Sequence, residues 1–255
     1  MFPRYLLSLA LIGTALVYAA DARVPVIVEL FTSEGCSDCP PADLLLRRMD
    51  RSQPVPGVRV IALEEHVDYW NSLGWPDPFS APQYRVRQND YGRKFLAENI
   101  YTPQMIVNGQ AVFVGSERDR AYQEVERAAQ LQTTTIGLSV APSAKDPDVV
   151  ELSVEISNPK QVKIRNSNVY LAVTENELTS NVSRGENSGR VLYHGPVVRS
   201  FGVIAKLDSR GSNRGAITNT LRLPREWKRE NLRAVVFVQE RDSYKITGAA
   251  EAELH

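Results

Sequence analysis

The 255-residue chain contains only two cysteines, and its 30 basic residues are balanced by 30 acidic ones. Two cysteines allow one disulfide within the monomer, so stability must come from ordinary hydrophobic cores rather than from a disulfide framework. The balanced charge, with no alternation of basic and aromatic residues, excludes the pattern typical of nucleic-acid binding. After the N-terminal segment, no apolar stretch reaches the roughly 20 residues that cross a membrane.

The N-terminal segment has the pattern of a secretory signal peptide. Residues 1–4 form a short positive start, residues 5–18 are apolar, and the small residues between Ala19 and Ala22 offer cleavage sites. The alternative is an uncleaved membrane anchor, for which the apolar stretch is short. We therefore predict a signal peptide over residues 1–22 and a soluble, periplasmic or secreted protein with no stable membrane span after cleavage. Disulfides persist in such a compartment.

The two cysteines form a C-x-x-C motif between a predicted strand and a predicted helix. Residues 24–31 are apolar and β-branched, as in a buried strand, and Cys36 and Cys39 follow. Pro40 and Pro41 suit a first helical turn, which opens a short helix over residues 42–49. This context is typical of a redox-active pair. The alternative is a stable disulfide that never turns over, in a protein used for binding.

The position of the motif assigns a role to each cysteine. At a helix start the first cysteine faces open N–H groups, which favour its thiolate, so we expect Cys36 to be the nucleophile and Cys39 the resolving thiol. Asp38 inside the motif and Glu34 just before it carry negative charge, which disfavours a neighbouring thiolate. A stabilised thiolate makes a strong oxidant. The pair is therefore expected to be a weaker oxidant, suited to a reductant or isomerase.

The first half alternates predicted strands and helices. A second strand follows at residues 58–63, and residues 81–98 are compatible with a helix. Two apolar runs within residues 101–114 are separated by Asn108-Gly109, the strongest short-range signal for a β-hairpin. A capping-box pattern at residues 116–119 opens a last helix that reaches residue 131. The predicted order is β-α-β-α-β-β-α.

This order, with C-x-x-C after the first strand and Thr102-Pro103 opening the third, resembles the thioredoxin fold. The resemblance implies that Pro103 is cis and lies, with Thr102, against the cysteine pair. Two departures stand out: Gly35 replaces the tryptophan before the first cysteine, and Glu29 lies seven residues before Cys36 instead of six. An offset of one residue along a strand directs the side chain to the opposite face of the sheet. Glu29 is either the proton acceptor for the inner thiol or a core-edge glutamate paired with a basic group.

A narrower resemblance extends over most of the chain. Residues 28–43, 66–70 and 73–75, and in the second half residues 184–187 and 198–199, are similar to a family of secreted bacterial thioredoxin-like proteins catalogued as a domain of unknown function. The resemblance places the chain without implying a demonstrated activity.

A second group of polar residues follows the second strand. His66, with Glu64, Glu65, Asp68 and Asp77, is either a proton shuttle or cation ligand, or part of a surface loop in which His and acids pair. A single His among carboxylates lacks a recognised ligand spacing, so we predict no metal and no cofactor.

Two further readings of the first half remain open. The aromatic residues Tyr69, Trp70, Trp75 and Phe79 either form a wall beside the thiols for an apolar peptide or pack the inserted loop. A Cu(I) site built from the two cysteines and Met105 is chemically permissible, since soft sulfur ligands suit that ion.

The second half lacks helical periodicity. Residues 150–156 alternate strictly between apolar and polar, as a half-buried strand does. Further strand candidates lie at residues 136–140, 169–173, 203–207, 216–223 and 232–238. Polar, glycine-containing loops lie at residues 180–189 and 209–215, and His194 is assigned to a loop or strand end. Six or seven short strands in about 120 residues favour a sandwich resembling immunoglobulin or fibronectin modules.

The sequence thus predicts an α/β thioredoxin-like domain over residues 23–134, followed by an all-β sandwich over residues 135–255. The leading function is a periplasmic thiol–disulfide oxidoreductase with a protein thiol or disulfide as substrate or redox partner. The alternatives are a non-catalytic envelope binding protein with a structural disulfide, and a copper-handling protein.

The first testable prediction concerns the redox potential of the Cys36–Cys39 pair. Because Glu34 and Asp38 disfavour the thiolate, equilibration with glutathione should give a potential more negative than the roughly −120 mV of strong oxidants. The Cys36→Ala variant provides the baseline. A measured potential near −120 mV would contradict the prediction.

Overall fold

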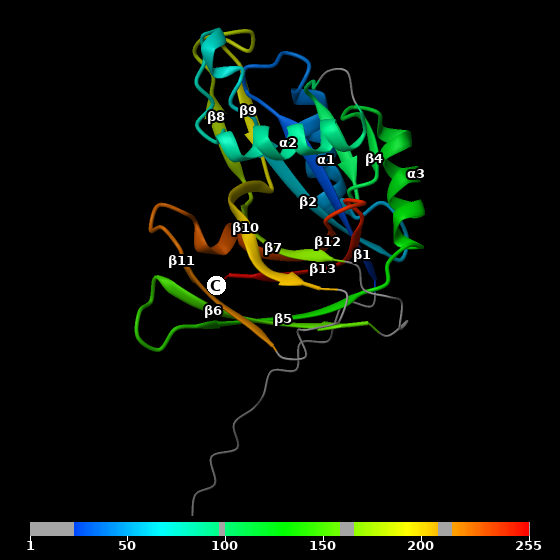
Figure 1. Ribbon diagram of the computed structural model, residues 1–255. Helices are drawn as coiled ribbons and strands as arrows, with labels where there is room; N and C mark the ends of the chain where they lie inside the picture. Colours follow the sequence, from blue (N-terminus) through cyan, green and yellow to red (C-terminus); the bar gives the residue numbers. More distant parts are fainter. Residues whose placement is uncertain (1–22, 97–99, 159–165, 209–215, 255) are drawn as a thin grey trace, which may run out of the picture.

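The computed structural model describes residues 23–96, 100–158, 166–208 and 216–254 (Figure 1). The predicted signal peptide and the predicted loop at residues 209–215 lie outside these ranges and stay predictions. Among the described residues, no helix has both the length and the apolar character needed to cross a membrane.

The first half forms the alternating elements that the sequence pattern predicts. They are β1 (Val24–Thr32), α1 (Pro40–Ser52), β2 (Val58–His66), the 3-10 helix η1 (Asn71–Leu73), α2 (Pro82–Lys94), β3 (Gln104–Val107), β4 (Ala111–Val114) and α3 (Arg118–Ala129). The predicted hairpin is confirmed, and Asn108 and Gly109 take the positive φ angles, 52° and 67°, that a tight hairpin turn requires.

The second half consists of strands and one short 3-10 helix in its described part. They are β5 (Thr135–Pro142), β6 (Val149–Ser157), β7 (Ser167–Glu175), β8 (Leu178–Asn181), β9 (Val191–His194), β10 (Val197–Leu207), β11 (Ile217–Arg222), η2 (Arg229–Asn231), β12 (Leu232–Glu240) and β13 (Ile246–Glu253). Strands β5, β6 and β11 form a separate sheet, the lower layer in Figure 1, and β8 pairs with β9.

The predicted fold class is wrong, because a single mixed sheet of eight strands runs through both halves. Its order is β13-β12-β7-β10-β2-β1-β3-β4. The strands of the second half therefore continue the sheet beyond β2, which would be an edge strand without them. β10 pairs with β2 in parallel, with Val197 opposite Glu64, and with β7 in antiparallel orientation. There is therefore no distinct thioredoxin-like α/β domain followed by a separate immunoglobulin-like sandwich. Whether residues 23–134 and 135–255 fold independently stays a prediction.

The alternation of side chains along β1 and β2 creates two cores on opposite faces of the sheet. Val26, Val28 and Leu30 of β1 point to the face covered by α1 and α3. Ile27 and Phe31 point to the other face, where a second core continues over residues of α2, β7, β10, β12 and β13. A third core lies between the three-stranded sheet and the outer face of β7 and β12. The sandwich-like packing of the second half therefore uses the shared sheet.

The sheet curls so that β13 approaches β1, with Cα atoms within 8 Å. Asn108 fixes this approach, since its Nδ2 donates to the carbonyl oxygen of Ile246 at 2.8 Å and its own carbonyl oxygen accepts from the Ile246 N–H at 3.1 Å. Arg59 of β2 also pairs with Glu251 of β13. The two halves thus share the second core rather than meeting only at a linker.

A buried arginine lies at the centre of that core. Arg87 of α2 pairs with Glu29 and lies 3.6 Å from the carboxylate of Glu65, and the hydroxyl of Tyr91 donates to Glu29 at 2.6 Å. Three rings of the second half, Tyr170, Phe201 and Phe237, lie with centroids 4.7–5.5 Å from its guanidinium carbon. Glu29 therefore occupies the face opposite α1, as a core glutamate paired with a basic group.

Replacing Arg87 should destabilise the protein far more than replacing its exposed neighbour Arg85. Arg87→Ala leaves Glu29 buried without its cation, which typically costs about 3–5 kcal/mol. Arg85 pairs with Asp68 at the surface, and Arg85→Ala should cost less than about 1 kcal/mol. Urea unfolding of both variants measures the difference. Similar losses in the two variants would contradict the assigned role of Arg87.

Candidate functional site

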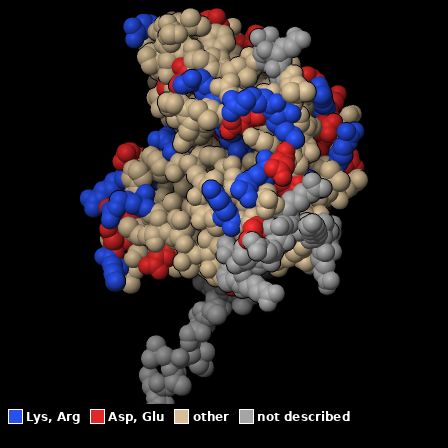
Figure 2. Space-filling view, viewed as in Figure 1, with Lys and Arg blue, Asp and Glu red and all other residues tan. Residues whose placement is uncertain are grey.

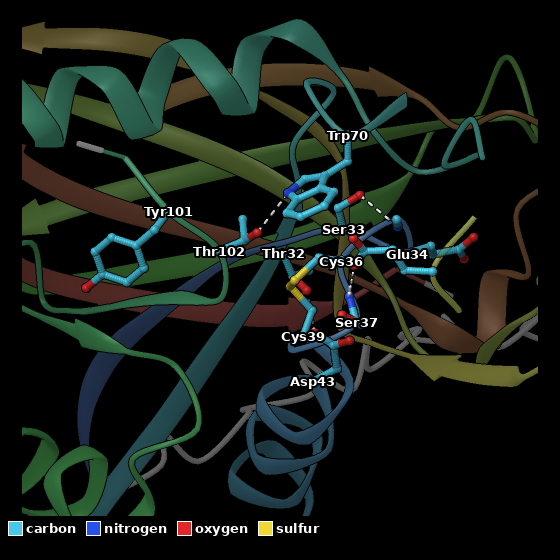
Figure 3. The surroundings of a disulfide bond; sticks show 12 residues. Thr32, Ser33, Glu34, Cys36, Ser37, Cys39, Asp43, Trp70, Tyr101 and Thr102 are labelled. Atoms are coloured by element: carbon cyan, nitrogen blue, oxygen red, sulfur yellow. Dashed lines mark hydrogen bonds between the residues drawn. A yellow bond between two sulfur atoms is a disulfide. The ribbon is translucent and has the colours of Figure 1, made fainter. Parts of the chain in front are cut away.

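Cys36 and Cys39 form a disulfide at the N-terminal end of α1, with their Cα atoms 5.4 Å apart (Figure 3). Cys39 is the N-cap residue, and its carbonyl oxygen accepts from the N–H groups of Ala42 and Asp43. Pro40 at the first helical position suits a turn in which the N–H has no helical partner. The predicted motif therefore stands where a helix dipole favours negative charge.

Both cysteines are buried, with exposed fractions of 1% for Cys36 and 0% for Cys39. A segment of the second half, residues 182–190 between β8 and β9, lies against the motif, and we call it the lid segment. Asn187 donates from Nδ2 to the carbonyl oxygens of Glu34 and Cys36, both at 2.9 Å. Glu186 accepts from the N–H of Ser37 at 3.0 Å. These contacts hold the lid segment against the backbone around Cys36.

The loop that contains Thr102 and Pro103 reaches the disulfide from the other side. Their peptide bond is cis, as the resemblance implied, and Pro103 is buried. The indole Nε1 of Trp70 donates to Thr102 Oγ1 at 2.9 Å, and Figure 3 shows both side chains beside the disulfide. A Cβ at Gly35 would lie 2.9 Å from Trp70 Cβ, so glycine is required where the indole packs over the motif.

Asp43, which the sequence reasoning did not single out, lies close to Cys39 on the first turn of α1 (Figure 3). Its carboxylate accepts from Thr32 Oγ1 at 2.6 Å and is 4% exposed. Burial, together with the negative charge of Glu64, raises the pKa of Asp43 to about 7. The signal that could have found it is spacing, because a residue four positions after Cys39 lies on the same helix face.

A second buried cluster joins residues from four separate segments. Glu64 and His66 end β2, His194 ends β9, and Asp77 belongs to the loop between η1 and α2. Glu64 Oε1 lies 3.0 Å from His194 Nδ1 and 3.4 Å from His66 Nε2, and Asp77 Oδ2 lies 2.7 Å from His66 Nδ1. Glu34 Oε1 lies 3.0 Å from His194 Nε2. All five residues are at least 96% buried.

The charges in this cluster shift one another's ionisation. Burial lowers the pKa of His66, but the neighbouring carboxylates of Asp77 and Glu64 outweigh it and raise that pKa well above its usual value. Burial also lowers the pKa of His194, but hydrogen bonding to Glu34 and Glu64 outweighs it and raises that pKa to about 9. At Asp77 the imidazole of His66 and the backbone N–H groups of Glu34 and Phe79 outweigh burial and hold the pKa below the usual range. The cluster therefore favours protonated imidazoles beside ionised, buried carboxylates.

The remaining predicted site residues lie apart from the disulfide or at the surface. Asp38 is exposed within the motif, and Asp68 binds Arg85. Met105 lies in the core beneath α1, and Trp75 donates from Nε1 to Glu34 Oε2 at 2.6 Å. Phe79 packs edge-on against the imidazoles of His66 and His194. The predicted aromatic residues thus serve different neighbours, and Trp70 is the one drawn beside the disulfide in Figure 3.

On the surface, charges of both signs are interspersed. Figure 2 shows Lys and Arg scattered among Asp and Glu on the visible face, without a large region of one sign.

Comparison with known proteins identifies the family. Residues 27–239 match the family described as a protein of unknown function, DUF1223, and the chain belongs to this family. No curated protein matches the chain.

Two solved structures show the same fold. The crystal structure of protein AGR_C_4864 from Agrobacterium tumefaciens is 27% identical, with a TM-score of 0.68 over 93% of this chain and 97% of that one. HBP35 of Porphyromonas gingivalis is 14% identical, with a TM-score of 0.64 over 92% of this chain and 76% of that one.

The raised pKa of Asp43 predicts a characteristic pH dependence of stability. The folded state holds this proton up to about pH 7, whereas the unfolded chain releases it near 3.8, so rising pH destabilises the fold between these values. Asp43→Asn, which stays neutral and keeps the acceptor for Thr32, should remove this loss. Its free energy of unfolding relative to wild type should therefore rise by a few kcal/mol from pH 4 to pH 7.

Urea unfolding across that pH range measures the difference between the two proteins. Asp38→Asn, at an exposed carboxylate near the same helix start, is the control and should follow wild type at every pH. A constant difference between Asp43→Asn and wild type would contradict the prediction.

Proposed function

We propose that the protein is a thiol–disulfide oxidoreductase of the bacterial envelope that uses Cys36 and Cys39. The observation that carries the proposal is the disulfide at the start of α1, with Asp43 beside it and a pKa of about 7. A group that titrates near neutral pH can both give and take the proton that thiol exchange requires. The cis Thr102–Pro103 loop and Trp70 complete the surroundings of the sulfur atoms.

The exchange can be written with its electrons and protons balanced. A substrate thiolate attacks Sγ of Cys36, the bond between the two cysteine sulfurs breaks, and Cys39 leaves as a thiolate. Protonated Asp43 gives its proton to Cys39. The Asp43 carboxylate then takes the proton of a second substrate thiol, whose sulfur attacks the substrate sulfur of the mixed disulfide and releases Cys36 as a thiolate. The substrate dithiol is oxidised and the protein disulfide is reduced, and the reverse sequence reduces a substrate disulfide.

The lid segment controls access in this mechanism. Attack on Sγ of Cys36 requires an approach along the S–S axis, and the buried sulfur atoms do not offer it while Asn187 and Glu186 bind the motif. A protein substrate that displaces the lid segment could replace these hydrogen bonds with its own backbone groups. The substrate class that fits is therefore an extended cysteine-containing segment of another protein.

The sequence supports the proposed location. The predicted signal peptide over residues 1–22 supports export, and a C-x-x-C disulfide is maintained in the periplasm or outside the cell. The proposal therefore places the exchange in the envelope, with a protein thiol or disulfide as partner and without a cofactor.

One observation favours a second candidate, a binding protein whose disulfide is structural. Neither cysteine is more than 1% exposed, and a structural disulfide is expected to be inaccessible. The two candidates differ in one measurable property. A working pair exchanges with thiols in the native state, whereas a structural disulfide reacts only when the protein unfolds.

Opening the lid segment should accelerate reduction of the disulfide. Asn187→Ala removes two hydrogen bonds to the motif, each worth about 1 kcal/mol, so native-state reduction by glutathione should become at least about tenfold faster. Asn181→Ala, at an exposed position of β8 in the same hairpin, is the matched control and should leave the rate unchanged. The rate is measured by alkylating the free thiols at timed intervals and quantifying the alkylated protein by mass spectrometry.

Two results would contradict the proposal. In the first, the wild-type disulfide resists glutathione until urea unfolds the chain, and the rate follows global unfolding. In the second, Asn187→Ala changes the unfolding midpoint but not the rate of reduction under native conditions. Either result would favour the structural disulfide.

A further inference from the structure

We propose that Glu64, His66 and His194 form a binding site for a divalent transition-metal ion such as Zn²⁺. The proposal rests on the buried cluster around β2 and β9 and uses neither cysteine, so it stands independently of the proposed exchange reaction. The ligand atoms of the three residues lie within 4.8 Å of one another, and all three side chains are fully or almost fully buried.

The spacing fits a zinc coordination sphere. With bonds of about 2.0–2.1 Å, the ligand atoms of a tetrahedral site lie about 3.3 Å apart. Glu64 Oε1 is 3.0 Å from His194 Nδ1 and 3.4 Å from His66 Nε2. All three ligand atoms lie within 4.8 Å of one another, so binding needs the two imidazole nitrogens to draw toward each other.

An unpartnered nitrogen points into this space. His66 is completely buried, and its Nε2 makes no hydrogen bond, although its distance to Glu64 Oε1 is short. A buried polar atom without a hydrogen bond is costly, and a metal ion would give it a strong partner. Nδ1 of the same ring faces Asp77, so a metal that displaces the Nε2 proton would bind the ring through Nε2.

Each ligand is backed by a second group, as ligands in metal sites usually are. Asp77 Oδ2 lies 2.7 Å from His66 Nδ1, and Glu34 Oε1 lies 3.0 Å from His194 Nε2. The second oxygen of Glu64 accepts from the N–H of Gly195 at 2.5 Å. These contacts orient the two rings and leave His66 Nε2 and His194 Nδ1 directed at the same carboxylate oxygen.

The charge and type of the ligands select the class of ion. Three carboxylates, those of Glu34, Glu64 and Asp77, surround two imidazoles, so the cluster can take up positive charge as protons or as a divalent cation. Imidazole nitrogen excludes Mg²⁺ and Ca²⁺ as preferred ions, and the absence of thiolate from the set disfavours Cu(I). Two His and one carboxylate, with one position left open, match the ligand sets of zinc sites.

The site would join both halves of the chain. Two ligands belong to β2 in the first half, and His194 ends β9 immediately before the Gly195–Pro196 turn into β10. A bound ion would therefore stabilise the native sheet by linkage, because the unfolded chain does not assemble the three ligands.

Refolding with metal tests the proposal on the full chain. The oxidised protein is unfolded in guanidinium with a chelator, freed of both, and refolded with or without Zn²⁺. Atomic absorption after gel filtration should find one Zn²⁺ per chain, and the melting temperature should rise relative to the zinc-free protein. Co²⁺ in place of Zn²⁺ should give the visible absorption of a tetrahedral site. Less than stoichiometric uptake with an unchanged melting temperature would overturn the proposal.

Substitutions locate the ion. Glu64→Gln and His194→Gln should abolish both the uptake and the rise in melting temperature, and Asp77→Asn should weaken binding about 10–100-fold. Asp68→Asn removes a nearby carboxylate that pairs with Arg85 outside the cluster, and it should bind Zn²⁺ as wild type does. Equal uptake by wild type, Glu64→Gln and His194→Gln would place the ion elsewhere and overturn the assignment.

A measurement on the wild-type protein tests the proposal even if the variants fail to fold. With ¹⁵N-labelled histidine, Zn²⁺ should shift the resonances of Nε2 in His66 and Nδ1 in His194, while the opposite nitrogen of each ring remains protonated. Spectra that are unchanged by Zn²⁺ at these two rings would overturn the proposal, whatever the variants do.

Discussion

The buried ionisable residues at the end of β2 constrain the rest of the structure. Glu64, Glu65 and His66 follow one another and are all 0% exposed. Strand alternation sends Glu64 and His66 to the face of α1 and Glu65 to the face of α2. Removing the partner of such a group costs about 3–5 kcal/mol, so each face needs its own compensating charges. Arg87 supplies them on one face and His194 on the other, which requires the second half to close over β2.

The buried polar cluster is also connected by hydrogen bonds to the segment that carries the disulfide. Asp77 Oδ2 accepts from the N–H of Glu34 at 2.8 Å and contacts His66 Nδ1 at 2.7 Å. Glu34 lies two residues before Cys36, and its backbone carbonyl oxygen accepts from Asn187 of the lid segment. A change in the charge of the cluster therefore acts directly on the backbone that carries the first cysteine and on the segment that covers it.

Several local signals in the sequence predicted local structure correctly, but the global arrangement could not be read from them. The capping box predicted at residues 116–119 was wrong, because Glu117 is the N-cap of α3 and no side chain caps the helix. Asn108-Gly109 predicted a hairpin and C-x-x-C before Pro40 predicted a helix start, because turn and cap chemistry depend on adjacent residues. The alternation that suggested a sandwich does not say which sheet a strand joins, so the pairing of β10 with β2 could not be predicted. His194 reaches His66 across more than a hundred residues, and only the closed sheet brings them together.

On the proposed function, opening of the lid segment is compatible with exchange, because the side-chain hydrogen bonds that hold it against the start of α1 are few. Three hydrogen bonds join the side chains of Glu186 and Asn187 to the motif. At about 1 kcal/mol each, they would lower the population of the open form roughly a hundredfold, a factor that slows exchange without abolishing it. A partner that binds the open form recovers this free energy, so the lid segment would discriminate between free thiols and a protein substrate. On the proposed function, the buried disulfide would be the resting state of a selective exchange site.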